Sequence, residues 1–265
     1  NYLAPSVRPI IERYFGKMNA LDSEFMDKCY VNNREYKTSE HGVKQLINDS
    51  LSPYFRDYNV KEFFNDKEGG AFGSRISSSA RDRRTRDVIV LFGGKGSGKS
   101  TFTHRLLYHR PPHPIQYFTR VVVIDLLECP ETQHRIEAEV WSQLITELDH
   151  DKVLEQSRDE LVKLFANRYE IALKQSLAGL SQDSEAFNVR LNSLIEEWKK
   201  DEPYCASQLA DYWKTRQKGI IIVIDNTDQF SPTLQDYCFT LSHSVSTLLD
   251  CLVVISMREE RFHYS

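Results

Sequence analysis

The sequence predicts an α/β fold in which a parallel central sheet is flanked by helices and preceded by a helical N-terminal extension. Four runs of consecutive aliphatic residues carry this prediction, at 88–92, 121–126, 219–225 and 251–256. Because the runs are continuous and rich in β-branched residues, they indicate strands buried on both faces, as in a parallel sheet. Patterns with helical spacing separate the runs, as crossovers between parallel strands require.

Residues 1–65 are expected to form a helical extension that packs on the sheet domain. Two patterns with helical spacing support this, namely Val7, Ile10, Ile11, Tyr14 and Phe15, and then Val43, Leu46, Ile47 and Leu51. Residues 66–86 are rich in Gly, Ser and Arg, which predicts a flexible linker. Its arginines are interpreted as a solvated charge run, with phosphate or nucleic acid as the alternative partner. The sheet domain is therefore placed at 87–265.

A glycine-rich segment directly follows the first predicted strand and fits the phosphate-binding pattern G-x-x-x-x-G-K-[ST]. Its members are Gly93, Gly94, Lys95, Gly96, Ser97, Gly98, Lys99, Ser100 and Thr101. Glycines let successive backbone N–H groups point at one anion, and a helix is expected to begin near Lys99. Lys99 is expected to reach the β- and γ-phosphates, and the Ser100 hydroxyl to bind Mg²⁺. The segment predicts binding of a nucleoside triphosphate, with ATP and Mg²⁺ as cofactors.

The third aliphatic run ends in Asp225-Asn226-Thr227-Asp228. In open α/β sheets ligands bind at the carboxyl ends of the strands, so Asp225 is the predicted Mg²⁺ partner of Ser100. Two interpretations of Asp228 stay open. Its carboxylate either orients the attacking water, or it caps the helix that starts after Ser231.

Arg258 follows the fourth aliphatic run. An arginine that leaves a strand beside the phosphate loop is suited to sensing the γ-phosphate, because its charge is permanent and its donors form a fixed fork. The alternative is a surface salt bridge with Glu259 or Glu260. The predicted catalytic residues are thus Lys99, Asp225, Asp228 and Arg258.

Helices are expected at 132–150 and 234–249, and a long polar helical insertion at 152–217, interrupted at Gly179 and Pro203. Apolar residues of the insertion are interpreted first as packing and second as a partner surface. They are Leu161, Leu164, Phe165, Tyr169, Leu191, Leu194, Ile195 and Trp198.

The composition of the chain limits the kinds of partner and the cellular compartment that we expect. The net charge of −4 gives no general attraction to nucleic acid or anionic lipid, so such a partner would need a local basic patch. Apolar runs fall short of the roughly 20 residues of a membrane span. The five cysteines are widely spaced, which favours reduced thiols in a cytoplasmic protein. The chain begins with Asn1, and we expect it to be part of a longer polypeptide with further domains.

Three motifs in this order resemble the signal-transduction ATPases with numerous domains (the STAND group) and their AAA+ and origin-recognition-type relatives. They are the phosphate-binding motif 93–101 (Walker A), the strand end 224–229 with its acidic motif (Walker B), and the strand end 254–258. The resemblance covers about 87–262. It implies a P-loop NTPase fold with a five-stranded parallel sheet and the phosphate-loop strand near its middle. It also implies an ATP-driven switch that self-assembles into a ring or a signalling homo-oligomer.

Two departures from this pattern qualify the functional prediction. AAA+ proteins usually carry Glu after the metal-associated Asp, where this chain has Asn226, so hydrolysis is expected to be slow. The chain also stops at Ser265, before the expected fifth strand and the lid that closes on adenine. The prediction is an ATP-binding, slowly hydrolysing switch domain of a larger signalling or antiviral-defence protein.

Two alternatives remain from the sequence. A P-loop kinase acting on a small molecule would use the insertion 152–217 to bind its substrate, and a non-catalytic nucleotide-binding scaffold is compatible with Asn226. A GTPase is disfavoured because no N/T-K-x-D motif follows the fourth strand, and an ABC-type ATPase because no LSGGQ-like signature precedes Asp225.

Overall fold

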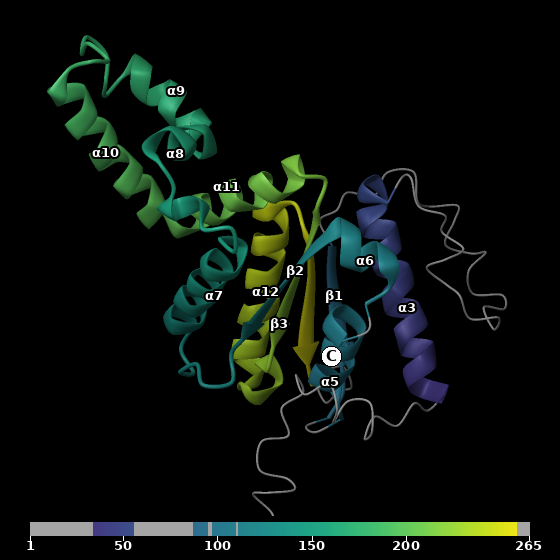
Figure 1. The fold of residues 1–265 in the computed structure, drawn as a ribbon. Helices are drawn as coiled ribbons and strands as arrows, with labels where there is room; N and C mark the ends of the chain where they lie inside the picture. Colours follow the sequence, from purple (N-terminus) through teal and green to yellow (C-terminus); the bar gives the residue numbers. More distant parts are fainter. Residues whose placement is uncertain (1–33, 56–86, 95–96, 110, 259–265) are drawn as a thin grey trace, which may run out of the picture.

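The computed structural model describes residues 34–55, 87–94, 97–109 and 111–258. Within them the chain forms an α/β fold with an all-parallel sheet between two layers of helices, as predicted (Figure 1). The first helical pattern of the N-terminal extension and the predicted linker 66–86 lie outside the described residues.

The sheet has four parallel strands in the order β1-β4-β3-β2. The strands are β1 (Asp87–Phe92), β2 (Thr119–Asp125), β3 (Gly219–Asp225) and β4 (Leu252–Met257). The register pairs Asp125 with Asp225 and Phe92 with Met257, so the carboxyl ends of all four strands meet at one edge. Each predicted strand is confirmed to within two residues.

Burial follows the position of each strand in the sheet. Every residue of β3 and β4, the two central strands, is buried, which explains their unbroken aliphatic sequences. Strands β1 and β2 lie at the edges and are only partly buried. The resemblance implied a five-stranded sheet with the phosphate-loop strand near its middle, but among the described residues β1 is an edge strand.

Three helices cover one face of the sheet: α7 (Gln133–Leu148), α11 (Glu202–Thr215) and α12 (Pro232–Leu249) (Figure 1). The predicted helices at 132–150 and 234–249 are thereby confirmed. Their apolar stripes pack on alternate residues of the central strands, such as Ile222 and Val253.

The other face is covered by α3 (Arg34–Leu51), α5 (Lys99–His104) with the π-helical turn η3 (Arg105–His109), and α6 (His113–Phe118). The short 3-10 helix η1 (Ser52–Tyr54) follows α3. Val43, Ile47 and Leu51 of the predicted pattern are buried against this face, whereas Leu46 is 42% exposed. A hydrogen bond of 2.8 Å from Ser50 Oγ to Asp87 Oδ2 joins the end of α3 to the start of β1.

Between α7 and α11 the chain forms an arm that projects from the sheet domain (Figure 1). The arm comprises η4 (Val153–Glu155), α8 (Arg158–Leu164), α9 (Ala166–Lys174) and α10 (Glu185–Lys200). Phe165 is fully buried in it, edge-to-face with Trp198 and stacked on Tyr204, so the packing interpretation is confirmed there. Both predicted interruptions are confirmed: Gly179 has φ +81° in the turn before α10, and Pro203 lies in the first turn of α11, directly after the break between α10 and α11.

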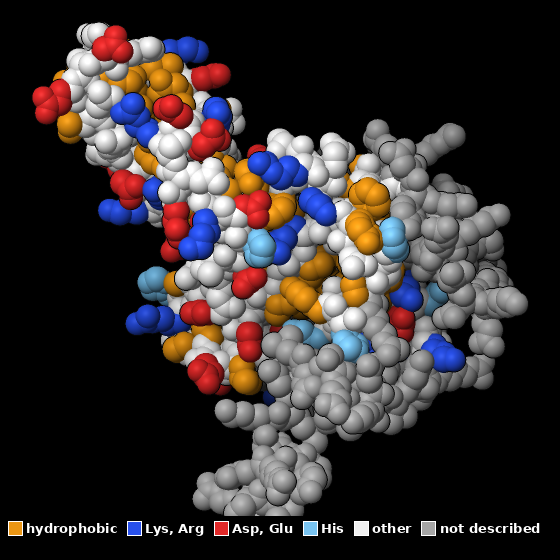
Figure 2. Space-filling model, in the orientation of Figure 1, with side chains coloured by type: hydrophobic (Ala, Val, Ile, Leu, Met, Phe, Trp, Pro, Cys, Tyr) orange, Lys and Arg blue, Asp and Glu red, His pale blue; other side chains and the backbone are white. Residues whose placement is uncertain are grey.

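The arm and α11 lie at the end of the sheet opposite to α5 (Figure 1). This follows from connectivity, because α7 starts after the carboxyl end of β2 and α11 ends just before the amino end of β3. Acidic and basic side chains are interspersed on the face shown in Figure 2. None of the helices in the described part of the chain has the length and apolarity needed to cross a bilayer.

Candidate functional site

The glycine-rich segment leaves β1 at the carboxyl edge of the sheet, as predicted. Gly93 N–H donates to the Met257 carbonyl of β4 (3.2 Å), and α5 begins at Lys99. A Cβ on Gly93 would lie 2.5 Å from Ser97 Oγ, and Gly98 has φ +85°, so both positions favour glycine. Lys95 and Gly96 lie outside the described residues.

Ser100 and Asp225, the predicted magnesium pair, are in contact although 125 positions separate them in the sequence. Ser100 Oγ donates to Asp225 Oδ1 at 3.0 Å. The same carboxylate oxygen accepts from Ser256 Oγ (3.2 Å) and from the Asn226 N–H (2.8 Å), and Asp225 is 4% exposed. A hydroxyl and a carboxylate thus lie side by side at the start of α5, which suits a hard cation such as Mg²⁺.

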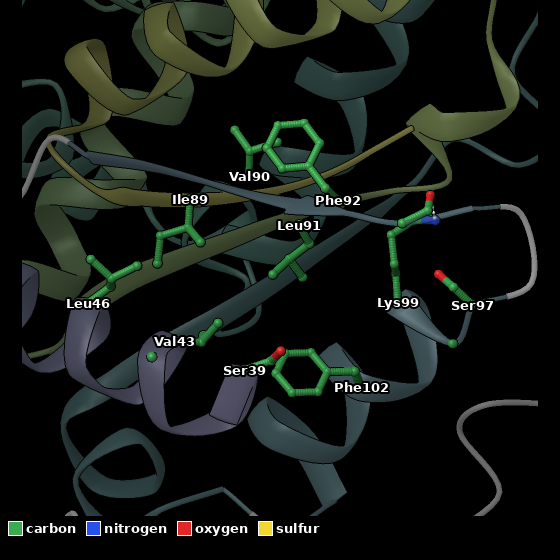
Figure 3. A pocket seen from close by; sticks show the side chains of 13 residues that line it. Ser39, Val43, Leu46, Ile89, Val90, Leu91, Phe92, Ser97, Lys99 and Phe102 are labelled. Carbon is green, nitrogen blue, oxygen red and sulfur yellow. Dashed lines mark hydrogen bonds between the residues drawn. The ribbon is translucent and has the colours of Figure 1, made fainter. Parts of the chain in front are cut away.

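Lys99 points back over the start of the glycine-rich segment (Figure 3). Its Nζ donates to the carbonyl oxygens of Gly93 (2.9 Å) and Gly94 (3.0 Å) and forms an ion pair with Asp228 Oδ2 (2.8 Å). The side chains of Lys99 and Asp228 are 9% and 17% exposed, so this pair is shielded from solvent.

Asp228 lies in the 3-10 turn η5 (Thr227–Gln229) between β3 and α12. The N-cap position of α12 is occupied by Ser231, so the structure does not support helix capping by Asp228. Its carboxylate is instead the acidic group that meets the lysine of the glycine-rich segment.

Asn226 turns away from this lysine. The residue adopts φ +60°, and its Nδ2 donates to Asp125 Oδ1 at 2.7 Å, across to the end of β2. The same Asp125 oxygen accepts from the Leu127 N–H at 2.8 Å. Sequence reasoning missed Asp125 as a site residue, although β2, like β3, is an aliphatic strand that ends in Asp.

The segment after β3 is therefore held by side chains that reach different neighbours. Asp225 contacts Ser100, Asn226 contacts Asp125, and Asp228 contacts Lys99. Between them, Thr227 Oγ1 donates to the carbonyl of Ser256 in β4, and the Gln229 amide donates to the carbonyl of Leu126. Five consecutive residues thereby join the turn to β2, β4 and α5.

Arg258 lies just after β4, beside the glycine-rich segment. Its N–H donates to Oε1 of Gln235 (3.2 Å), a residue of α12 that is 2% exposed. The guanidinium Nε is buried and has no hydrogen-bond partner within the described residues. The structure thus places Arg258 next to the glycine-rich segment, and among the described residues no hydrogen bond or ion pair joins its guanidinium to Asp225. The alternative partners Glu259 and Glu260 lie outside the described residues.

His104 is a second residue that the sequence analysis missed. It lies one helical turn after Ser100 on α5, and its Nδ1 is buried without a hydrogen-bond partner in the described structure. Burial lowers the pKa of His104, while the carboxylates of Asp225 and Asp125 act in the opposite direction. The neutral ring is therefore favoured beside the predicted magnesium pair.

A pocket of about 490 Å³ opens next to the glycine-rich segment, between α3, β1 and α5 (Figure 3). Its walls are mostly apolar side chains, namely Val43, Leu46, Ile89, Leu91, Phe92 and Phe102. Gly93, Ser97, Gly98 and Lys99 line one end. The pocket therefore combines an apolar cleft with hydrogen-bond donors that are suited to phosphate, and a nucleotide requires both.

Among the described residues, no group of three or more His, Cys, Asp or Glu side chains could hold a metal ion. A magnesium ion held by one hydroxyl, one carboxylate, water and phosphate oxygens needs no such group. Comparison of the chain with protein-family models, curated proteins and solved structures found no match. Functional inference therefore rests on the geometry of this edge of the sheet.

Proposed function

We propose that the chain is a P-loop-type domain that binds ATP with Mg²⁺ and hydrolyses it slowly, as a switch within a larger protein. The observation that carries the proposal is the contact between Ser100 and Asp225, directly beside Lys99. A lysine, a hydroxyl and a carboxylate in this order serve a metal-bound triphosphate.

Each residue has a separate task in this proposal. Backbone N–H groups of the glycine-rich segment and Lys99 bind the phosphates, and Ser100 with Asp225 hold Mg²⁺. When bound, the ion neutralises charge on the β- and γ-phosphates. The apolar pocket beside β1 receives the nucleoside, which we propose to be adenosine.

Slow hydrolysis is inferred from Asn226 and Asp228, whose side chains contact different neighbours. Asn226, at the position where AAA+ proteins usually have Glu, is bonded to Asp125 and has no carboxylate to offer. Asp228 is the carboxylate that faces Lys99, and we assign to it the positioning of the attacking water. Arg258, whose Nε is buried without a partner in the described part, is assigned to sensing the γ-phosphate.

The arrangement of the arm bears on the kinase alternative. A kinase would need the insertion 152–217 close to the phosphate site, but α8, α9 and α10 project from the opposite end of the sheet (Figure 1). The switch is therefore favoured over the kinase. Self-assembly into a homo-oligomer, action with further domains of the same polypeptide, and a role in signalling or defence are parts of the proposal that rest on the resemblance alone.

Lys99→Ala tests the nucleotide site. It removes the positive charge that lies over the Gly93 and Gly94 carbonyls, so affinity for a non-hydrolysable ATP analogue with Mg²⁺ should fall at least about tenfold, as for the loss of a charge-assisted contact. Isothermal titration calorimetry measures this. Lys163→Ala, in an exposed ion pair of the arm, removes the same charge far from the site and should bind as wild type does. Equal affinities for wild type and Lys99→Ala would contradict the proposal.

A further inference from the structure

All three donors of the Lys99 ammonium group already have acceptors. An ammonium group carries three N–H donors and no acceptor. Lys99 Nζ lies 2.9 Å from the Gly93 carbonyl oxygen, 3.0 Å from the Gly94 carbonyl oxygen and 2.8 Å from Asp228 Oδ2. A phosphate that binds Lys99 must therefore displace at least one of these partners.

Asp228 is the one charged partner of the three, and it occupies the type of position that a phosphate oxygen would take. The pair is largely shielded, with side-chain exposures of 9% and 17%, so water screens it less than it screens an exposed pair. A shielded carboxylate on the phosphate-binding lysine competes with any incoming anion, and its removal should free the lysine.

The position of Asp228 is set by its neighbours in the turn. Asn226 anchors the turn to Asp125 at the end of β2 (2.7 Å), and Thr227 anchors it to the carbonyl of Ser256 in β4. Asn226 adopts φ +60°, a left-handed conformation that Asn adopts more readily than most residues other than glycine. Asn226 and Asp125 therefore act through Asp228 and are positioning residues.

We propose that Asp228 is a built-in competitor for the phosphate site, held on Lys99 by the Asn226–Asp125 brace, and that nucleotide must displace it to bind. The inference rests on the proposed function, since it concerns the same phosphate site. When a triphosphate replaces Asp228 as the partner of Lys99, the Asp228 carboxylate is released beside the phosphates, where it can position water. One residue thus opposes binding first and supports hydrolysis afterwards.

Asp228→Asn tests the competition directly, because it removes the charge and keeps the shape. Affinity for a non-hydrolysable ATP analogue with Mg²⁺ should rise roughly three- to tenfold, the scale of a shielded ion pair lost from the competing state. Asp211→Asn is the matched control: it removes the same charge from an ion pair with Lys214 on α11, at the other end of the sheet, and should leave affinity unchanged. Thermal melting of each variant confirms that it is folded.

Asn226→Ala and the exchange Asp125→Asn with Asn226→Asp test the brace. Loss of the brace in Asn226→Ala should loosen Asp228 and also raise affinity, by a smaller factor than Asp228→Asn. The double exchange restores an amide–carboxylate hydrogen bond with donor and acceptor reversed, and should return affinity to the wild-type value. A purely structural role for Asn226 predicts the opposite sign, namely weaker binding in Asn226→Ala.

The outcomes separate this inference from the proposed function. If wild type binds the ATP analogue, Lys99→Ala does not, and Asp228→Asn binds no more tightly than wild type, the competition is overturned and the nucleotide site stands. If neither wild type nor Asp228→Asn binds the analogue, the proposed function and the inference fall together. Weaker binding by folded Asn226→Ala overturns the brace.

Discussion

Asp225 shows at the scale of one residue how the site is preorganised. One of its carboxylate oxygens accepts three hydrogen bonds, from Ser100, Ser256 and the backbone of Asn226. Because a buried carboxylate needs such partners, the same bonds that stabilise Asp225 also fix its position beside the Ser100 hydroxyl. Structural and functional demands on this residue therefore coincide.

Asp225→Asn should separate these two demands. The amide keeps an oxygen that can accept the three hydrogen bonds, so the variant should fold, but it loses the charge that attracts Mg²⁺. We expect Mg²⁺ to enhance nucleotide affinity much less in the variant, while affinity without Mg²⁺ stays near the wild-type value. Titration of the ATP analogue with Mg²⁺ and with EDTA measures both. If Mg²⁺ enhanced nucleotide affinity in the variant as much as in wild type, Asp225 would have no role in binding the ion.

His104 gives a pH dependence to stability. Burial holds its pKa below the usual value of 6.5, so below about pH 6.5 the unfolded chain binds more protons than the folded one, and stability falls as the pH falls. His104→Gln removes this contribution. In urea titrations between about pH 7.5 and about pH 5.5, wild type should lose more stability than the variant, by well under the roughly 1.4 kcal/mol per pH unit of a full proton, because the ring is partly exposed to solvent. Parallel pH curves for the two proteins would contradict this assignment.

At the scale of elements, β3 and its following turn show what sequence patterns could and could not predict. The buried strand was predicted at its correct bounds, because seven residues buried without a break leave an unmistakable aliphatic run. The contact between Asn226 and Asp125 was not predicted, because it depends on β2 being the neighbour of β3. The order of the strands is a tertiary property that the periodicity of the sequence does not encode.

Short helices on the face of the sheet covered by α3 and α5 show a further limit of prediction from the sequence. The helix α6 and the π-helical turn η3 have five or six residues each, too few for a periodic apolar pattern to stand out. His104 escaped prediction for a related reason, since its burial beside Asp225 results from packing of α5 on the sheet and not from any local motif. The glycine-rich segment was predictable because its chemistry is local: its glycines, lysine and serine are consecutive.

At the scale of the whole molecule, the sheet separates the candidate site from the arm. Lys99, Ser100, Asp225 and Asp228 all lie at the carboxyl edge of the sheet, whereas the arm is connected through the end of α7 and the start of α11. Trp213 Nε1, in the last turn of α11, donates to the carbonyl of Leu148 at the end of α7 at 2.8 Å. The arm shares one hydrophobic cluster with the sheet through α11, but it joins the sheet at the end opposite to Asp225, so we expect loss of packing in the arm to have little effect on the phosphate site.

Phe165→Ala tests this separation. Phe165 is fully buried between Trp198 and Tyr204, so its truncation should cost about 3–5 kcal/mol of local stability. We expect faster amide hydrogen exchange in α8, α9 and α10, with nucleotide affinity within about twofold of wild type. Hydrogen exchange monitored by mass spectrometry, together with calorimetric titration of the ATP analogue, measures both effects on one protein sample.

Ile222→Ala provides the comparison for this test, because Ile222 is fully buried in β3, the strand that ends in Asp225. Its truncation should cost about 2–5 kcal/mol and raise exchange across the sheet, and with it weaken nucleotide binding. The two variants are expected to lose similar amounts of stability, but one loses apolar contacts in the arm and the other loses them in the sheet. A large loss of nucleotide affinity in Phe165→Ala would mean that the arm is coupled to the phosphate site, as the kinase alternative requires, in spite of its position at the opposite end of the sheet.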